Sequence, residues 1–151
     1  MRYAPLLAFA CATVLLACSE PTAAEHLALT VTLDRTTLVP PNDLQIRIKV
    51  LNPTRHEVQF SGSGSGTLWA DIRTAGGGSA VQRPITDDLR FWTLEPGDSL
   101  EVIQKWNGRA NAIGPYAAVA PGSYTVVARL TAREVRLTSA PVPLTVAPAV
   151  P

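Results

Sequence analysis

The sequence predicts an all-β fold, an antiparallel immunoglobulin-like β-sandwich without disulfides. Short runs alternate apolar and polar residues, which is the period of a strand with one buried face. Glycine, proline and asparagine turns separate these runs. No window shows the longer period of an amphipathic helix. Roughly seven to nine short strands in one domain are typical of this architecture.

The alternation is clearest at 44–51, where Leu44, Ile46, Ile48 and Val50 alternate with mostly polar or charged residues. A similar run covers 124–131. Proline-rich residues 35–43 are expected to form a loop, and Pro84 marks 81–85 as a weak edge-type strand. The remaining strands are expected at 27–34, 58–60, 68–73, 89–94, 100–106 and 134–146, the last exposed at an edge because of Pro141 and Pro143.

The stretch 89–106 holds two of the three tryptophans, Trp92 and Trp106. Between its two strands lies Glu95-Pro96-Gly97-Asp98, in which proline and then glycine suit a type II turn. We therefore predict a core hairpin here, held by its aromatic ends.

The glycine/serine run 61–66 is predicted to be a mobile hairpin loop. It does not fit a serine nucleophile elbow, because residue 64 is glycine where serine is required. It does not fit a phosphate loop either, since no Gly-Lys-Ser/Thr follows it.

Residues 1–17 are predicted to be a lipoprotein signal peptide. A positive start precedes the apolar run 6–16, which is shorter than the roughly 20 residues that span a bilayer. The following Leu15-Leu16-Ala17-Cys18 resembles the bacterial lipobox. That resemblance implies cleavage between Ala17 and Cys18 and acylation of Cys18. The alternative is an ordinary signal peptide with a chance cysteine.

Residues 18–26 are predicted to be a lipidated tether, and 27–147 the folded domain. Cys11 would leave with the signal peptide and Cys18 would carry lipid, so the domain has no thiol. The expected location is the cell envelope. By resemblance to lipoprotein sorting, Ser19 indicates the periplasmic face of the outer membrane in a host with two membranes.

Charge and residue types argue against several functions. Thirteen Lys/Arg against twelve Asp/Glu give a net charge of +1, so nucleic acid is not expected as a partner. The two histidines, His26 and His56, are far apart in the sequence, and no metal-ligand spacing is present. No catalytic residue, metal or cofactor is assigned, and the protein is expected not to be an enzyme.

A set of motifs between Leu44 and Leu130 resembles the intracellular proteinase inhibitor (BsuPI) family. The residues that carry the resemblance are Asn52, Val58-x-Phe60-Ser61, Phe91-Trp92, Leu94-x-Pro96-Gly97-Asp98-Ser99, Trp106 and Pro121-Gly122-Ser123-Tyr124-x-Val126. The resemblance implies an immunoglobulin-like fold and inhibition of a subtilisin-type serine protease. The predicted lipoprotein signal departs from that setting, because it places the chain outside the cytoplasm.

The expected function is therefore protein binding by a membrane-anchored domain, with a subtilisin-type serine protease as the suggested partner. The alternative is a structural or accessory envelope module without inhibitory activity. The long loop 107–122 is the candidate contact, because long loops on rigid strands are often functional. Its candidate residues are Arg109, Pro115 and Tyr116, although Tyr116 would alternatively pack beneath its own loop.

Overall fold

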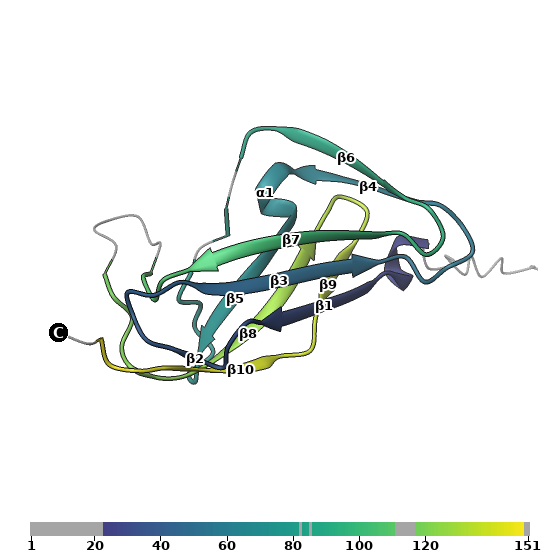
Figure 1. The fold of residues 1–151 in the computed structure, drawn as a ribbon. Coiled ribbons are helices and arrows are strands. Elements are labelled where there is room, and N and C mark those ends of the chain that lie inside the picture. Colours follow the sequence, from purple (N-terminus) through teal and green to yellow (C-terminus); the bar gives the residue numbers. More distant parts are fainter. Residues whose placement is uncertain (1–22, 82, 85, 111–116, 150–151) are drawn as a thin grey trace, which may run out of the picture.

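The computed structural model describes residues 23–149 except 82, 85 and 111–116, and within that range it is built mainly of antiparallel strands (Figure 1). Two short helical turns are η1 (Ala23–His26) and α1 (Gly64–Thr67). The strands are β1 (Ala28–Leu33), β2 (Thr37–Leu38), β3 (Leu44–Leu51), β4 (Val58–Ser63), β5 (Leu68–Thr74), β6 (Leu89–Leu94), β7 (Ser99–Trp106), β8 (Gly122–Thr131), β9 (Arg136–Thr138) and β10 (Val142–Val146). The described residues contain no cysteine, so the all-β, disulfide-free prediction is confirmed for them.

The strands form three sheets. The first sheet has the order β1-β3-β7, and the second has β2-β10-β8-β5 with β9 paired to β8. The third is the pair β4-β6. All pairs are antiparallel except β2 with β10. Because β4, α1 and β5 follow one another in the chain, the third sheet continues from the second across one helical turn.

The core lies between the first and second sheets, as contacts of β1 with β8 and of β3 with β5 show. One face of each predicted strand supplies it, and the alternation predicted from sequence is confirmed in β3 and β8. Fully or almost fully buried are Leu44, Ile46, Ile48 and Val50 of β3, and Tyr124, Val126, Ala128 and Leu130 of β8. Strand β5 differs, since Leu68–Ile72 are buried on both faces.

The prediction of a hairpin over 89–106 was wrong. The turn forms as expected, with Gly97 at φ +84° and Asp98 N–H donating to the Glu95 carbonyl at 3.0 Å. In the described chain, however, β6 pairs with β4 and β7 pairs with β3. The turn therefore carries the chain from one layer to another, and Figure 1 shows β6 and β7 diverging beyond it.

The predicted mobile loop over 61–66 is also wrong. Strand β4 continues to Ser63, and α1 follows directly. A Cβ on Gly64 would lie 2.4 Å from the Asp88 carboxylate, and one on Gly66 would lie 2.3 Å from the Pro84 carbonyl. These glycines therefore permit close packing and are not a flexible linker.

Three smaller expectations change as well. The segment 35–43 contains the short strand β2, because Leu38 is buried in the core. The described residues of 81–85 do not form a strand. Strand β10 is not an exposed edge over its whole length, since it lies between β8 and β2.

Candidate functional site: a groove beside strand β7

An open groove of about 570 Å³ lies between β6 with α1 on one side and β7 on the other. Pockets of this size hold small ligands or short peptide segments. The residues that line it are Gly64, Ser65, Leu68, Pro84, Thr86, Asp88, Arg90, Trp92, Leu100, Val102, Ile103 and Gln104. It exists because β6 and β7 separate after their shared turn and do not pair.

The walls of the groove are largely apolar. Trp92 is half-buried and stacks on Phe60, with ring centroids 5.4 Å apart and an angle of 18° between the planes. Leu100 and Val102 of β7 are only partly buried, although they pack against the core. The groove therefore leaves an edge of the hydrophobic core accessible to a ligand.

Polar groups stand at one end of the groove. The Arg90 guanidinium lies 2.6 Å from the Asp88 carboxylate. Hydrogen bonds from Thr86 and Arg90 hold the pKa of Asp88 below its ordinary value. Gln104 is held differently, because its Oε1 accepts a hydrogen bond from Ala70 N–H at 3.0 Å. Asp88 and Arg90 are thus both charged, and the net charge at this end of the groove is close to zero.

The backbone of β7 is open on the groove side. In β3, the Gln45 carbonyl accepts from Asp34 N–H on the β1 side. In an antiparallel strand, the backbone N–H and C=O groups of successive residues point to opposite sides of the strand. The backbone groups of Leu44, Ile46, Ile48 and Val50 therefore point toward β7. Their partners are Leu100, Val102, Gln104 and Trp106. The backbone groups of the alternate residues, Glu101, Ile103 and Lys105, therefore point to the free edge.

Exposed apolar side chains surround this region. Phe91 is 77% exposed, Leu89 66% and Ile103 51%, values unusual for large apolar residues. Ile103 borders the groove, whereas Leu89 and Phe91 project from the opposite face of β6 to the groove-lining Arg90 and Trp92. Ile103 thus adds to the accessible apolar surface of the groove, and contiguous apolar surface of this kind often marks an interaction site.

The turn that separates β6 from β7 is fixed by Asn52, which is fully buried. Its Nδ2 donates to the carbonyls of Leu94 (2.9 Å), His56 (2.8 Å) and Glu95 (3.2 Å). Its backbone N–H donates to the Asp98 carbonyl at 2.9 Å, and its own carbonyl accepts from Gly97 N–H at 2.9 Å. Asn52 thus holds the β6 end of the turn through its side chain and the β7 end through its backbone.

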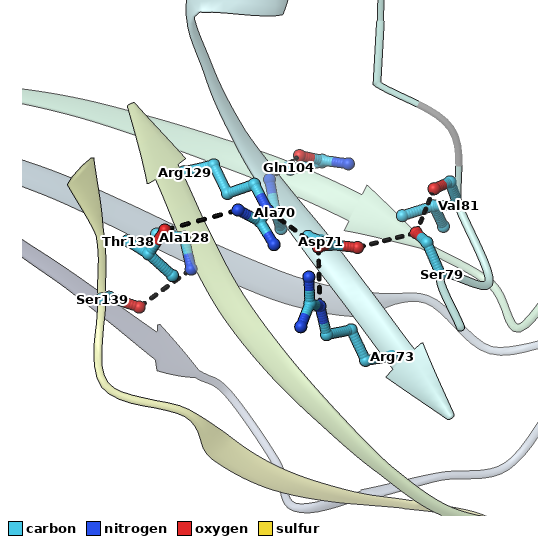
Figure 2. A network of polar contacts seen from close by, with 10 residues as sticks. All are labelled: Ala70, Asp71, Arg73, Ser79, Val81, Gln104, Ala128, Arg129, Thr138 and Ser139. Atoms are coloured by element: carbon cyan, nitrogen blue, oxygen red, sulfur yellow. Dashed lines mark hydrogen bonds and ion pairs between the residues drawn. The ribbon is translucent and has the colours of Figure 1, made fainter. Parts of the chain in front are cut away.

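A buried ion network holds the segment after β5 (Figure 2). The Asp71 carboxylate accepts from Arg129 at 2.8 Å, Arg73 at 2.9 Å and Ser79 at 2.7 Å. Burial raises the pKa of Asp71, but these three hydrogen bonds outweigh burial and hold it below its ordinary value. The single Ser79 hydroxyl proton is shared between Asp71 and the Val81 carbonyl, so the network anchors the chain just before it reaches the groove.

The predicted contact loop 107–122 is described only at its base. Val119 N–H donates to the Gly108 carbonyl at 2.8 Å, and Ala110 N–H donates to the Ala117 carbonyl at 2.9 Å. Arg109 is exposed there, and its carbonyl accepts from Trp106 Nε1 at 2.8 Å. Pro115 and Tyr116 lie outside the described residues.

The predicted anchor residues Ala17 and Cys18 also lie outside the described residues. Within residues 23–149, as far as they are described, no helix is long and apolar enough to cross a membrane. The same residues contain no cluster of three or more His, Cys, Asp or Glu side chains that would hold a metal ion.

The groove does not lie at the predicted loop, and sequence reasoning missed it. Arg90, Trp92 and Val102 were expected to belong to a closed hairpin, in which no groove exists. The sequence held no direct signal for it, because the exposed apolar residues Leu89 and Phe91 lie on the face of β6 opposite to the groove.

No family model matches the chain, and no curated protein matches it. Among solved structures, a β-glucosidase of Erythrobacter marinus is similar over 80% of this chain, with 16% identity and a TM-score of 0.52. The match covers 15% of that enzyme, so the chain spans only a small part of its length. At this identity the likeness concerns the fold alone.

Two further structures are similar at lower scores. A β-glucosidase of Listeria innocua matches with a TM-score of 0.48 and 12% identity, over 82% of this chain and 16% of that one. A Pseudomonas fluorescens alkylpurine DNA glycosylase matches with a TM-score of 0.49 and 10% identity, over 82% and 30%.

Proposed function

We propose that this chain is a lipid-anchored envelope protein whose immunoglobulin-like domain binds another protein through the groove beside β7. The observation that carries the proposal is the combination of an accessible apolar groove with the exposed side chain of Ile103 at its border. A few residues, tryptophan prominent among them, supply most of the binding energy of protein interfaces, and Trp92 lines this groove.

The immunoglobulin-like assignment is supported by a tyrosine at the start of β8. Tyr124 Oη donates to the Ala120 carbonyl at 2.7 Å, four residues upstream. A tyrosine that bonds back to the backbone near the start of the sixth strand is a hallmark of such sandwiches. The ring also packs edge-on against Trp106, with centroids 6.4 Å apart.

A serine protease of the subtilisin kind is the partner class that the resemblance to the proteinase inhibitors suggests. Membrane attachment through Cys18 would restrict that partner to the outside of the cytoplasm. Attachment also raises the local concentration of the domain at the membrane surface, so a modest affinity would suffice there.

Titration of the purified protein against subtilisin-type proteases tests the inhibitory part of this proposal. The proposal predicts inhibition that is abolished by Ile103→Lys and unaffected by Thr30→Lys. Both positions are exposed on the first sheet, but only Ile103 borders the groove. Binding of an envelope protein without inhibition would instead support an accessory module. Unchanged binding in Ile103→Lys would contradict the groove as the site.

A further inference from the structure

We infer that the groove accepts an extended segment of the partner protein as an added β-strand beside β7, with an acidic residue opposite Lys105. This inference rests on the proposed protein-binding function and specifies its mode. Strand addition needs an unpaired edge, a place for inward side chains and a reason for register. The described residues provide all three.

The unpaired edge is formed by Glu101, Ile103 and Lys105, whose backbone groups point away from β3. No hydrogen bond between these backbone groups and another strand is found in the described part of the chain. Three N–H and three C=O groups are therefore available over about 13 Å of strand, from the rise of 3.2–3.4 Å per residue. An added strand would satisfy them at the ordinary spacing between neighbouring strands.

Space for inward side chains is provided by the groove, which lies between β7 on one side and β6 with α1 on the other. A strand beside β7 would lie against Trp92 and Leu68, which already line the groove. Alternate residues of the guest would cover the exposed flanks of Leu100 and Val102, and would extend the core by one strand.

The side chains on the outward face of β7 determine how a guest strand aligns with it. Glu101 is already paired with Arg47 at 2.7 Å, and Ile103 is a half-exposed apolar residue. Lys105 is exposed and forms no ion pair with any other described residue. A guest strand with an apolar residue opposite Ile103 and a carboxylate opposite Lys105 matches this face.

The same features argue for a partner segment over a second copy of the chain. Pairing of two β7 edges would bring two whole domains together, and the β6 layer of each would compete for the space beneath the joint. A single added strand brings no second β6 layer and so avoids that competition. Lysine on a free edge also discourages unselective strand pairing.

The test uses the full-length chain, purified in detergent, to select binders from a displayed library of random peptides about ten residues long. The expected binders alternate apolar and polar residues and carry one acidic residue. Lys105→Glu should weaken the best synthetic peptide about two- to fivefold, and exchanging its acidic residue for lysine should restore affinity. Arg136→Glu is the matched control and should change little, because Arg136 is exposed on β9 of the second sheet and, like Lys105, forms no ion pair with another described residue.

Two measurements identify strand addition itself. N-methylation of one alternate set of peptide amides should abolish binding, while methylation of the other set should leave it nearly unchanged, because only one set faces β7. Residue-resolved hydrogen exchange should show the amides of Glu101, Ile103 and Lys105 slowing at least about tenfold on binding. Those of Val102 and Gln104 should be slow with and without peptide.

Any of three results would overturn the inference: no peptide is selected, N-methylation leaves binding unchanged for both sets of amides, or the hydrogen exchange of the Ile103 amide does not slow. A dimer that protects these amides without peptide would overturn it in favour of a second copy. If a partner protein binds the chain but leaves the exchange at Ile103 unchanged, strand addition fails and protein binding stands. If Ile103→Lys also leaves that binding intact, the proposed site fails as well.

Discussion

Replacing Asn52 by alanine tests how the chain keeps β6 and β7 apart. The substitution removes the donor to three carbonyl groups while it leaves the backbone hydrogen bonds of residue 52 in place. The Leu94 carbonyl is buried, and leaving it unpaired costs about 1–3 kcal/mol. The carbonyls of His56 and Glu95 reach water more easily, so each lost bond costs about 0.5–1 kcal/mol. The expected loss in unfolding free energy is about 2–5 kcal/mol.

The assay is a urea titration followed by tryptophan fluorescence. Asn52→Asp is the matched variant, because it keeps an acceptor for the Thr54 hydroxyl, which lies 2.7 Å from Asn52 Oδ1, but places a carboxylate oxygen against the three carbonyls. At neutral pH it should destabilise more than alanine does. A loss below about 1 kcal/mol in Asn52→Ala would refute the reasoning that this side chain holds the turn.

Further predictions concern the anchor, the core and the ion network. Cys18→Ala should remove acylation and release the chain from the membrane fraction; equal retention of both forms would contradict the lipobox assignment. Trp106→Ala should cost about 3–5 kcal/mol by denaturant titration, and half-buried Trp92→Ala should cost less, so the reverse order would show that the burial assignment is wrong. Gly66→Ala should destabilise the fold by about 1–3 kcal/mol, because its Cβ would meet a backbone carbonyl at 2.3 Å, and an unchanged midpoint would argue against that close approach. The folded pKa of Asp71 lies below its ordinary value of 3.8, so its contribution is present above that pH and is lost as pH falls through the folded value; the stability gap to Asp71→Asn should therefore narrow in acid, and a gap that is constant with pH would contradict the ion network.

Strand positions were predictable where a strand has one buried face. In β3, Ile46 and Ile48 are buried in the core while Arg47 and Lys49 are exposed to solvent. The alternation of apolar and polar residues in the sequence therefore follows the two faces of the strand. In β5 the signal was weaker, because Trp69 and Asp71 on the second face of the strand are buried as well, and Asp71 is bound by Ser79 of the following segment. Burial there depends on a tertiary contact that local pattern does not contain.

The local pattern did not predict which strands β6 and β7 pair with, and so it did not predict the groove between them. Pro96 and Gly97 specify a turn, but a turn does not specify whether its two strands pair with each other. That choice depends on Asn52, which lies more than forty residues earlier in the chain and binds Leu94 and Glu95. The glycines of 61–66 likewise resemble a flexible linker until Asp88 and Pro84 are placed against them.

Site-specific photo-crosslinking in the native envelope tests the central claim most directly. A photoreactive residue at position 103 should join the chain to one discrete protein partner. The same residue at position 30, exposed on the far strand of the first sheet, should not. Crosslinks of equal yield at both positions, or at position 30 alone, would contradict a protein-binding groove beside β7.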